Sequence, residues 1–198
     1  SENPHQCAVH GPGPESRVIL AFDMPSVLVL REATLADERA VLAAHRATSP
    51  EYPSFLHFHD DDMLFRRYLD VLDDARGGRL TGTDDFVPET FLFAFVDGQV
   101  VGRAALRHRL TPALEREGGH IGYVVVPACR RRGHATEILR QALGIAGRSL
   151  GLRRVLVTCD ATNDGSIRTI EKNGGVLEDV VEGPDLDVPK RRYWIDLQ

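Results

Sequence analysis

The order of the predicted elements indicates an α/β (α+β) protein in which helices cover both faces of one mixed sheet. Two apolar runs, 90–96 and 100–107, flank Asp97-Gly98, a dipeptide typical of tight hairpins, and therefore predict two antiparallel strands. Two later strands, 119–126 and 155–159, are each followed by apolar residues at helical spacing. Since a strand, a helix and a further strand require a crossover, hairpins and crossovers are combined in one sheet.

Local signals place the other elements in chain order. Thr34 and Asp37 have the spacing of a capping box, which begins a helix that we expect to run to about Ala47. Apolar residues recur at helical spacing from Met63 and stop at Gly77-Gly78, which predicts a second helix. We also expect strands at 27–30, 176–181 and 192–197, a helix that closes near Gly151, and a short helix at 163–172 that ends at Asn173-Gly174-Gly175.

Length and composition indicate one domain. The 198 residues, of which 42% are hydrophobic and 27% are charged, are typical of a globular chain with a single core. The first 17 residues contain several prolines and glycines and almost no apolar periodicity. We therefore interpret 1–17 as a flexible N-terminal extension and 18–198 as the folded domain.

Charge, hydropathy and cysteine content argue against several classes of function. With 24 Lys+Arg against 29 Asp+Glu, the net charge is -5, so the chain offers no overall basic field to nucleic acids. No apolar run approaches the roughly 20 residues of a bilayer span, and residues 1–16 contain no signal-peptide core. Cys7, Cys129 and Cys159 cannot all pair, which favours reduced thiols. We expect a cytoplasmic protein with neither a nucleic-acid nor a membrane partner.

The turn that follows the strand 119–126 combines the features of a phosphate site. From Arg130 to Ala135 it reads Arg-Arg-Arg-Gly-His-Ala and leads into a helix, whose first amides lack acceptors and carry positive partial charge. Gly133 and Ala135 leave room for an anion to approach these amides, and the arginines add charge. A solvated basic turn is the alternative, and the turn by itself leaves both interpretations open.

Residues 125–135, Val-Val-Pro-Ala-Cys-Arg-Arg-Arg-Gly-His-Ala, resemble the acetyl-CoA signature Val-x-Pro-x-x-(Arg/Gln)-x-x-Gly-x-(Gly/Ala) of the GNAT superfamily of N-acetyltransferases. Asn163, Ser166 and residues 170–175, Ile-Glu-Lys-Asn-Gly-Gly, resemble a second motif of this superfamily, with Gly175 in place of the usual Phe. Residues 106–110, 118–123 and 193–195 are similar to a subgroup of predicted acetyltransferases. The resemblance covers residues 27–197.

The resemblance implies a mostly antiparallel central sheet in which the strands 121–126 and 155–159 splay apart. Acetyl-CoA, the acyl donor, would lie in this gap, with its pantetheine arm along the first strand and its pyrophosphate at the start of the following helix. Asn163 would lie near the thioester or cap its own helix. The residues implied for acetyl-CoA are Tyr123, Val124, Val125, Val126, Arg130, Arg131, Arg132, Gly133, His134, Ala135, Thr136, Asn163 and Ser166.

The sequence departs from the family pattern at the position of the catalytic base. A primary ammonium must lose a proton before it attacks a thioester, and the glutamate that often serves this purpose falls on Gly119. His120, Glu117 and Tyr123 are the nearby replacements, with His120 acting through a water as the favoured base. A buried, purely structural His120 remains an open alternative.

A second departure concerns the proton donor to the leaving thiolate. The tyrosine that often has this role falls on Ile170, which has no proton to donate. Ser166 lies one helical turn earlier, so we expect its hydroxyl to bond the sulfur directly or through water. A helix-start serine without a catalytic role is the alternative.

We expect an acyltransferase that moves an acetyl group from acetyl-CoA to an amine of an unidentified acceptor, a small molecule or a peptide, by direct attack. Acceptor sites in this fold are built by residues equivalent to 48–72, which are aromatic and acidic here. A cationic amine is compatible with this segment, and so is a plain solvated surface. The rival function is a non-catalytic acyl-CoA-binding sensor or scaffold, because both common catalytic positions are vacant. A homodimer also stays open.

Residues 57–62, His-Phe-His-Asp-Asp-Asp, look at first like a binuclear zinc motif. The motif requires a final histidine where the chain has Asp62, and no core strand precedes it. We therefore expect no metal site. The aspartates are expected to cap the helix that begins at Met63, where the helix dipole favours negative charge.

Overall fold

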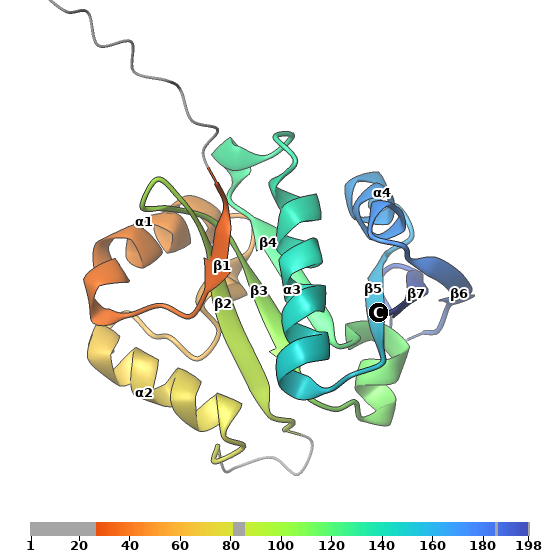
Figure 1. Cartoon of the computed structure of the whole chain (residues 1–198), viewed down its shortest axis with the longest axis horizontal. Coiled ribbons are helices and arrows are strands. Elements are labelled where there is room, and N and C mark those ends of the chain that lie inside the picture. Colours follow the sequence, from red (N-terminus) through yellow and green to blue (C-terminus); the bar gives the residue numbers. More distant parts are fainter. Residues whose placement is uncertain (1–26, 81–85, 185, 198) are drawn as a thin grey trace, which may run out of the picture.

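The structure is a computed structural model that describes residues 27–80, 86–184 and 186–197. The extension expected at 1–17 and the domain start expected at Val18 lie outside these residues. In the described part, the strands form two antiparallel sheets (Figure 1). The first sheet has the order β1-β2-β3-β4, with β1 (Val29–Arg31), β2 (Glu89–Val96), β3 (Gln99–Arg107) and β4 (Ile121–Val125). The second has the order β5-β7-β6, with β5 (Arg154–Asp160), β6 (Val176–Val181) and β7 (Lys190–Asp196).

Helices cover both faces of the first sheet. The pair α1 (Glu38–Thr48) and α2 (Phe65–Arg76) packs on one face, while α3 (His134–Leu150) crosses the other and joins the two sheets (Figure 1). The short α4 (Asp164–Lys172) packs against α3 and β5. Short helical turns complete the described part: η1 (Leu35–Asp37), η2 (Pro53–Leu56), the π-turn η3 (Leu114–Gly118) and η4 (Pro127–Cys129).

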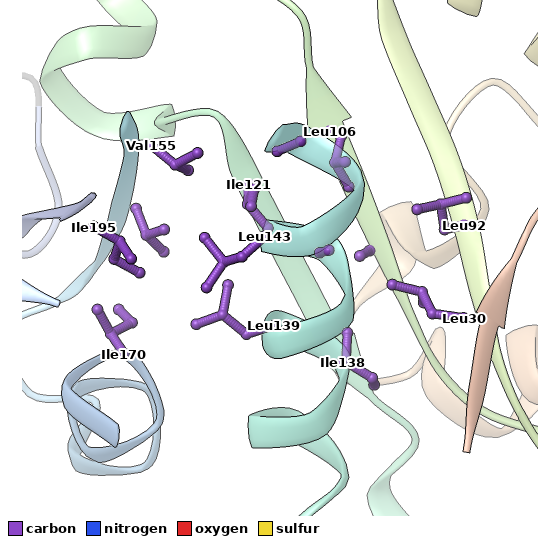
Figure 2. Close-up of a cluster of buried hydrophobic side chains, with 14 of the residues drawn as sticks. Leu30, Leu92, Leu106, Ile121, Ile138, Leu139, Leu143, Val155, Ile170 and Ile195 are labelled. Atoms are coloured by element: carbon purple, nitrogen blue, oxygen red, sulfur yellow. The ribbon is translucent and has the colours of Figure 1, made fainter. Parts of the chain in front are cut away.

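Two apolar clusters hold these layers together. In the larger one, Leu139 and Leu143 of α3 lie between Ile121 of the first sheet and Val155 and Ile195 of the second (Figure 2). The smaller cluster fills the opposite face of the first sheet, where side chains of α1, η2 and α2 pack on the phenylalanines of β2. Because each buried aliphatic side chain contributes about 1.5–3 kcal/mol, these clusters fix the orientation of β4 relative to α3 and β5.

The expected fold class is confirmed. The hairpin between β2 and β3 turns at Asp97 and Gly98, whose φ angles of 49° and 76° are those of a type I′ turn. Thr34 and Asp37 form the expected capping box. The one mixed sheet separates into two antiparallel sheets, because β4 and β5 do not form a ladder.

Two boundaries differ from expectation for identifiable reasons. The strand expected from residue 119 begins at Ile121, since Gly119 has φ 64° and ψ -177° and cannot continue a strand. The helix expected from Met63 begins at Phe65, and its N-cap is Leu64, without a side-chain cap bond. The prediction that aspartates 60–62 cap this helix is therefore wrong. Instead, Asp60 accepts a hydrogen bond from the Asp62 amide within the loop.

Within the ranges 27–80, 86–184 and 186–197, no helix combines the length and the apolar character needed to span a bilayer. The longest helix is α3, with 17 residues.

Candidate functional site

The start of β4 is pinned to β5 by two hydrogen bonds at one residue. The His120 amide donates to the Leu156 carbonyl at 2.7 Å, and the Leu156 amide donates to His120 Nδ1 at 2.9 Å. Beyond this point the strands diverge, and a cavity of about 790 Å³ opens between β4, the turn before α3, and α4. The gap between the two sheets is thus closed at one end by His120 and open at the other.

The alternation of hydrogen bonds along β4 decides which of its backbone groups face this gap. Arg107 donates to the His120 carbonyl and Val126 donates to the Val101 carbonyl, so the even-numbered residues of β4 bond to β3. The N–H and C=O groups of Tyr123 and Val125 consequently point toward β5, where no ladder takes them up. Apart from the Val125 carbonyl, which accepts a hydrogen bond from Arg130 Nε at 3.3 Å, they form a free strand edge along the cavity, to which an extended ligand could pair.

At the open end, the turn before α3 presents free amides. Arg131 and Gly133 adopt left-handed conformations, with φ of 64° and 82°. The first helical bond runs from the Glu137 amide to the Gly133 carbonyl at 3.2 Å, and within the described part of the chain no acceptor takes the amides between Arg131 and Thr136. Left-handed turns of this kind make concave nests for anions, and the positive end of the α3 dipole adds to the attraction.

The residues of the predicted turn do not all face the cavity. Arg131, Gly133, His134, Ala135 and Thr136 line it, together with Arg130, Val124, Val125 and Tyr123. Arg132 and Val126 do not line it. Val126 is buried under α1 and α2, and its amide is bonded to β3, so neither its side chain nor its amide is free for a ligand.

Arg130 has a positioning role in this turn. Its Nη1 donates to Glu51 at 2.7 Å and its Nε donates to the Val125 carbonyl at 3.3 Å. These bonds tie the turn to the loop after α1 and to the open edge of β4. The exposed ion pair with Glu51 offsets part of the positive charge of Arg130, so the amides and Arg131 add to the attraction for an anion.

Two hydroxyls meet on the wall between β4 and α4. Tyr123 Oη and Ser166 Oγ share a hydrogen bond of 2.8 Å, and both side chains line the cavity. Burial raises the pKa of Tyr123 to about 12, against the opposing effect of the bond to Ser166. Tyr123 thus keeps its proton at every physiological pH and is a donor rather than a base.

Asn163 both caps α4 and lines the cavity. Its Oδ1 accepts a hydrogen bond from the Ser166 amide at 3.0 Å, which satisfies one of the free amides at the start of the helix. This bond fixes the first turn of α4 and with it the position of Ser166. Ile170, one turn later, is fully buried in the core between α3 and the second sheet (Figure 2).

Of the three candidate bases, Tyr123 lines the cavity, whereas His120 and Glu117 do not. His120 is 8% exposed, and its Nδ1 accepts the Leu156 bond, so the neutral ring carries its proton on Nε2 and has no free acceptor nitrogen. Burial and then Arg107 lower the pKa of His120, which favours this neutral form. Glu117 is exposed on η3, where its carbonyl accepts a hydrogen bond from Thr158. In this geometry His120 accepts the hydrogen bond of a buried backbone amide, a contact typical of a structural histidine.

The vacant glutamate position has a steric cause. A Cβ on Gly119 would lie 2.6 Å from the Leu156 carbonyl oxygen, and the φ of 64° is itself unfavourable for any other residue. The close approach of β5 that pins β4 therefore requires glycine. A base at this position is incompatible with the way the two strands meet.

Replacing His120 tests its structural role. We expect His120→Ala to lower the free energy of unfolding by about 1–3 kcal/mol, because the buried Leu156 amide loses its acceptor. His120→Asn, whose Oδ1 can take the same bond, should recover most of this loss. In the folded protein the pKa of His120 lies below its ordinary value of 6.5. The contribution of neutral His120 to the free energy of unfolding is therefore complete above pH 6.5, and it is lost as the pH falls through the lowered pKa. Urea unfolding at several pH values measures all three effects, and equal stability of the alanine variant would contradict this role.

Several residues of the cavity were not predicted from the sequence. Those on α4 share one helix face, at spacings of three and four residues, and this spacing could have indicated them once Ser166 was placed on a helix. The missed residues are Tyr52, Cys129, Asp160, Gly165, Arg168, Thr169 and Lys172. Arg168 and Lys172 add two cations to the wall opposite the turn, which extends the anionic preference of the site.

The histidines of the segment 57–62 point to different neighbours. His57 stacks on Phe91 with a ring-centroid distance of 6.2 Å, whereas His59 packs edge-on against Tyr68 at 5.3 Å. Over the described ranges, no group of three or more His, Cys, Asp or Glu side chains is arranged to hold a metal ion.

The fold is shared with solved acetyltransferase structures. The chain is 15% identical to RimL, a ribosomal L7/L12 alpha-N-protein acetyltransferase solved with coenzyme A, over 88% of this chain and 96% of that one, with a TM-score of 0.62. It is 17% identical to yncA from Salmonella typhimurium, a proposed acetyltransferase solved with acetyl-CoA, over 86% and 94%, with a TM-score of 0.57. It is 13% identical to MccE, a microcin C7 self-immunity acetyltransferase solved with acetyl-CoA and AMP, over 86% and 92%, with a TM-score of 0.59.

At these identities, the likeness to solved structures shows the fold alone. No curated protein is significantly similar in sequence. The model of the acetyltransferase (GNAT) domain matches residues 28–176, which include the whole first sheet, the turn before α3, and α4. The acetyl donor of this family is acetyl-CoA. The chain therefore belongs to the GNAT acetyltransferase domain family.

Proposed function

We propose that this acetyltransferase moves an acetyl group from acetyl-CoA to a primary amine by direct attack, within the cavity between β4 and α4. The proposal rests on two features that lie at the two ends of this cavity. Free amides of the turn before α3 lie at one end, and the Tyr123–Ser166 hydroxyl pair lies where α4 meets β4.

The residues present fit acetyl-CoA. The pyrophosphate suits the amides from Arg131 to Thr136, and the extended pantetheine arm suits the free edge at Tyr123 and Val125. Acetyl-CoA supplies an activated thioester. The turn, the strand edge and the hydroxyl pair orient that group and hold the thioester end near Tyr123 and Ser166.

The reaction forms a C–N bond and breaks the C–S bond of the thioester. The acceptor enters as an ammonium and must lose one proton before attack and one after it, while the departing thiolate regains one. In the proposed mechanism, Tyr123 and Ser166 hydrogen-bond the departing thiolate and donate a proton to it, and water then returns a proton to this hydroxyl pair. Tyr123 is available as the donor because it stays protonated below about pH 12. The protons of the acceptor leave through water, since His120 and Glu117 do not line the cavity.

Ser166→Ala tests the donor pair. We expect kcat to fall about tenfold, because a single hydrogen bond contributes on the order of 1 kcal/mol and 1.36 kcal/mol corresponds to one decade. The affinity for acetyl-CoA, measured by calorimetry, should stay near that of the wild type. The matched control is Thr48→Ala, which removes a helix hydroxyl outside the cavity lining, one that donates to the Ala44 carbonyl. Equal rates for wild type and Ser166→Ala would show that Ser166 is a residue of the first turn of α4 without a catalytic role.

The second candidate function is a non-catalytic acyl-CoA sensor or scaffold. It is favoured by Gly119 and the buried Ile170, which leave the family's two usual catalytic positions without a titratable side chain. Turnover of acetyl-CoA with a panel of amines separates the two functions. Tight binding without acetylation of any amine, in a preparation with the native fold, would favour the sensor.

A further inference from the structure

The face of the first sheet under α1, η2 and α2 contains an unusual polar residue. Because β2, β3 and β4 are antiparallel and in register, their side chains on this face form three rows across the sheet. From one end of β4 to the other, the rows are Glu89–Arg107–His120, Phe91–Ala105–Gly122 and Phe93–Arg103–Val124. Arg103 is thus an arginine placed inside the apolar part of the face.

Arg103 is deeply buried and incompletely satisfied. It is 5% exposed, its Nη2 donates to the Ser54 carbonyl at 3.1 Å, and its Nε has no hydrogen-bond partner. Its Cζ lies 5.5–5.9 Å from the ring centres of Phe91, Tyr52 and Phe55. Over residues 27–80, 86–184 and 186–197, no carboxylate forms an ion pair with it. A buried cation in this state is costly, so its presence calls for a partner.

Arg103 does not line the cavity itself, but two residues next to it do. Val124, the neighbour of Arg103 in its row, lines the cavity, and so does Tyr52, whose ring lies over the guanidinium. Gly122 lies in the adjacent row, and a Cβ built on it would meet no atom within 4 Å. This face of the sheet therefore has open space at Gly122, beside the gap between β4 and β5. A molecule that approaches a thioester near Tyr123 from this face would pass Gly122 and Val124, and Val124 is the residue of β4 paired with Arg103.

The charges on this face leave one positive charge unbalanced. Arg107 pairs with Glu89 at 3.2 Å and donates to the carbonyls of Gly118 and Gly119, so that pair is neutral. Burial lowers the pKa of His57, which stacks on Phe91, so His57 adds no charge at neutral pH. The remaining uncompensated charge is that of Arg103.

We propose that the acceptor is a small primary amine that bears one carboxylate, as an amino acid does, and that Arg103 binds this carboxylate. The inference rests on the proposed function and specifies its acceptor. One unbalanced cation matches a monoanion better than a doubly charged phosphate. A guanidinium with free donors is also the group that recognises a carboxylate geometrically. The acidic residues 60–62, which are compatible with a cationic amine, lie in the loop above this face, whereas the charge buried beneath that loop is basic.

Arg103→Met tests the proposal in two independent ways. The first readout is acceptor specificity, measured with the amino acids that have a primary amine and with their carboxamides. The wild type should acetylate at least one free acid with a kcat/KM about 10- to 100-fold above its amide, the range of one charge-assisted hydrogen bond. In Arg103→Met this ratio should approach one. The affinity for acetyl-CoA should not change. Arg140→Met, which removes an exposed arginine of α3, is the control and should keep the wild-type ratio.

The second readout is thermal unfolding, which requires no turnover. Arg103→Met should melt no lower than the wild type, because an unpaired buried cation is replaced by an apolar side chain. The preferred amino acid should raise the Tm of the wild type and of Arg140→Met but not that of Arg103→Met, and its amide should raise none of them.

Failure of the inference and failure of the proposed function give different results. Equal acetylation or equal stabilisation by acids and amides would overturn the carboxylate while leaving acetyl transfer intact. An unchanged preference in Arg103→Met would assign the carboxylate to another residue and overturn the role of Arg103. A wild type that neither binds nor turns over acetyl-CoA would sink the proposed function, while the Tm series with amino acids would still decide on Arg103.

Discussion

Replacing Gly133 by aspartate should abolish the binding of acetyl-CoA while leaving the fold intact. Gly133 is the N-cap of α3 and lines the cavity beside the free amides of the turn. A Cβ there would meet no atom within 4 Å, so the new side chain fits sterically and extends into the anion site. Like charges forced together in a binding site cost several kcal/mol, so the affinity should fall by more than about 100-fold. Calorimetric titration with acetyl-CoA measures the loss.

Two variants separate charge from backbone strain. The φ of 82° at Gly133 costs a non-glycine residue about 1–2 kcal/mol, and asparagine tolerates it best. Gly133→Asn should therefore retain much more affinity than Gly133→Asp. Gly151 ends the same helix with φ 66° and equally open space, about 25 Å away along the axis, so Gly151→Asp carries the same charge at a remote site. A Gly133→Asp protein that binds as tightly as Gly151→Asp would remove the turn from the acetyl-CoA site.

Tyr123→Phe should have the second largest effect, on kcat rather than on binding. The substitution keeps the ring that packs against the core but removes the hydroxyl that bonds Ser166. General acid catalysis contributes about 10²- to 10⁴-fold, and because thiols are acidic leaving groups we expect the lower end, a loss of about 100-fold. The KM for acetyl-CoA should change little.

The pH profile and a matched control identify this loss as proton donation. The pKa of Tyr123 is raised to about 12. The ionisation of Tyr123 should therefore cause no fall in wild-type kcat as the pH rises toward that value. Tyr193→Phe removes another buried tyrosine hydroxyl, on β7 and outside the cavity lining, and should leave kcat unchanged. If Tyr123→Phe and Tyr193→Phe turned over alike, the donor would have to be water or the thiolate would leave unaided.

The parts of the fold that sequence predicts well are those set by local patterns. The β2–β3 hairpin follows from Asp97-Gly98 between two apolar runs, and the turn before α3 follows from the small residues and arginines at the start of an amphipathic helix. Both depend on residues within a few positions of each other. The splitting of the sheet was not accessible in this way, because it depends on how β4 and β5 approach each other across α3.

The candidate site was predicted less completely because its key contacts join distant segments. Tyr123 and Ser166 are 43 residues apart, and only the position of α4 beside β4 brings their hydroxyls together. For His120, residue type suggested a base, but the backbone amide that occupies its Nδ1 is a property of the folded strands. The sequence did not indicate a role for Arg103, because a single arginine within a strand is normally exposed. Its burial becomes evident only when the face of the sheet that it occupies is known.

A crystal structure of the protein with acetyl-CoA tests the proposed site most directly. We expect the pyrophosphate on the amides between Arg131 and Thr136, the pantetheine arm along Tyr123 and Val125, and the thioester sulfur within hydrogen-bonding reach of Tyr123 Oη or Ser166 Oγ. Acetyl-CoA bound elsewhere, or a thioester directed away from the Tyr123–Ser166 pair, would contradict it.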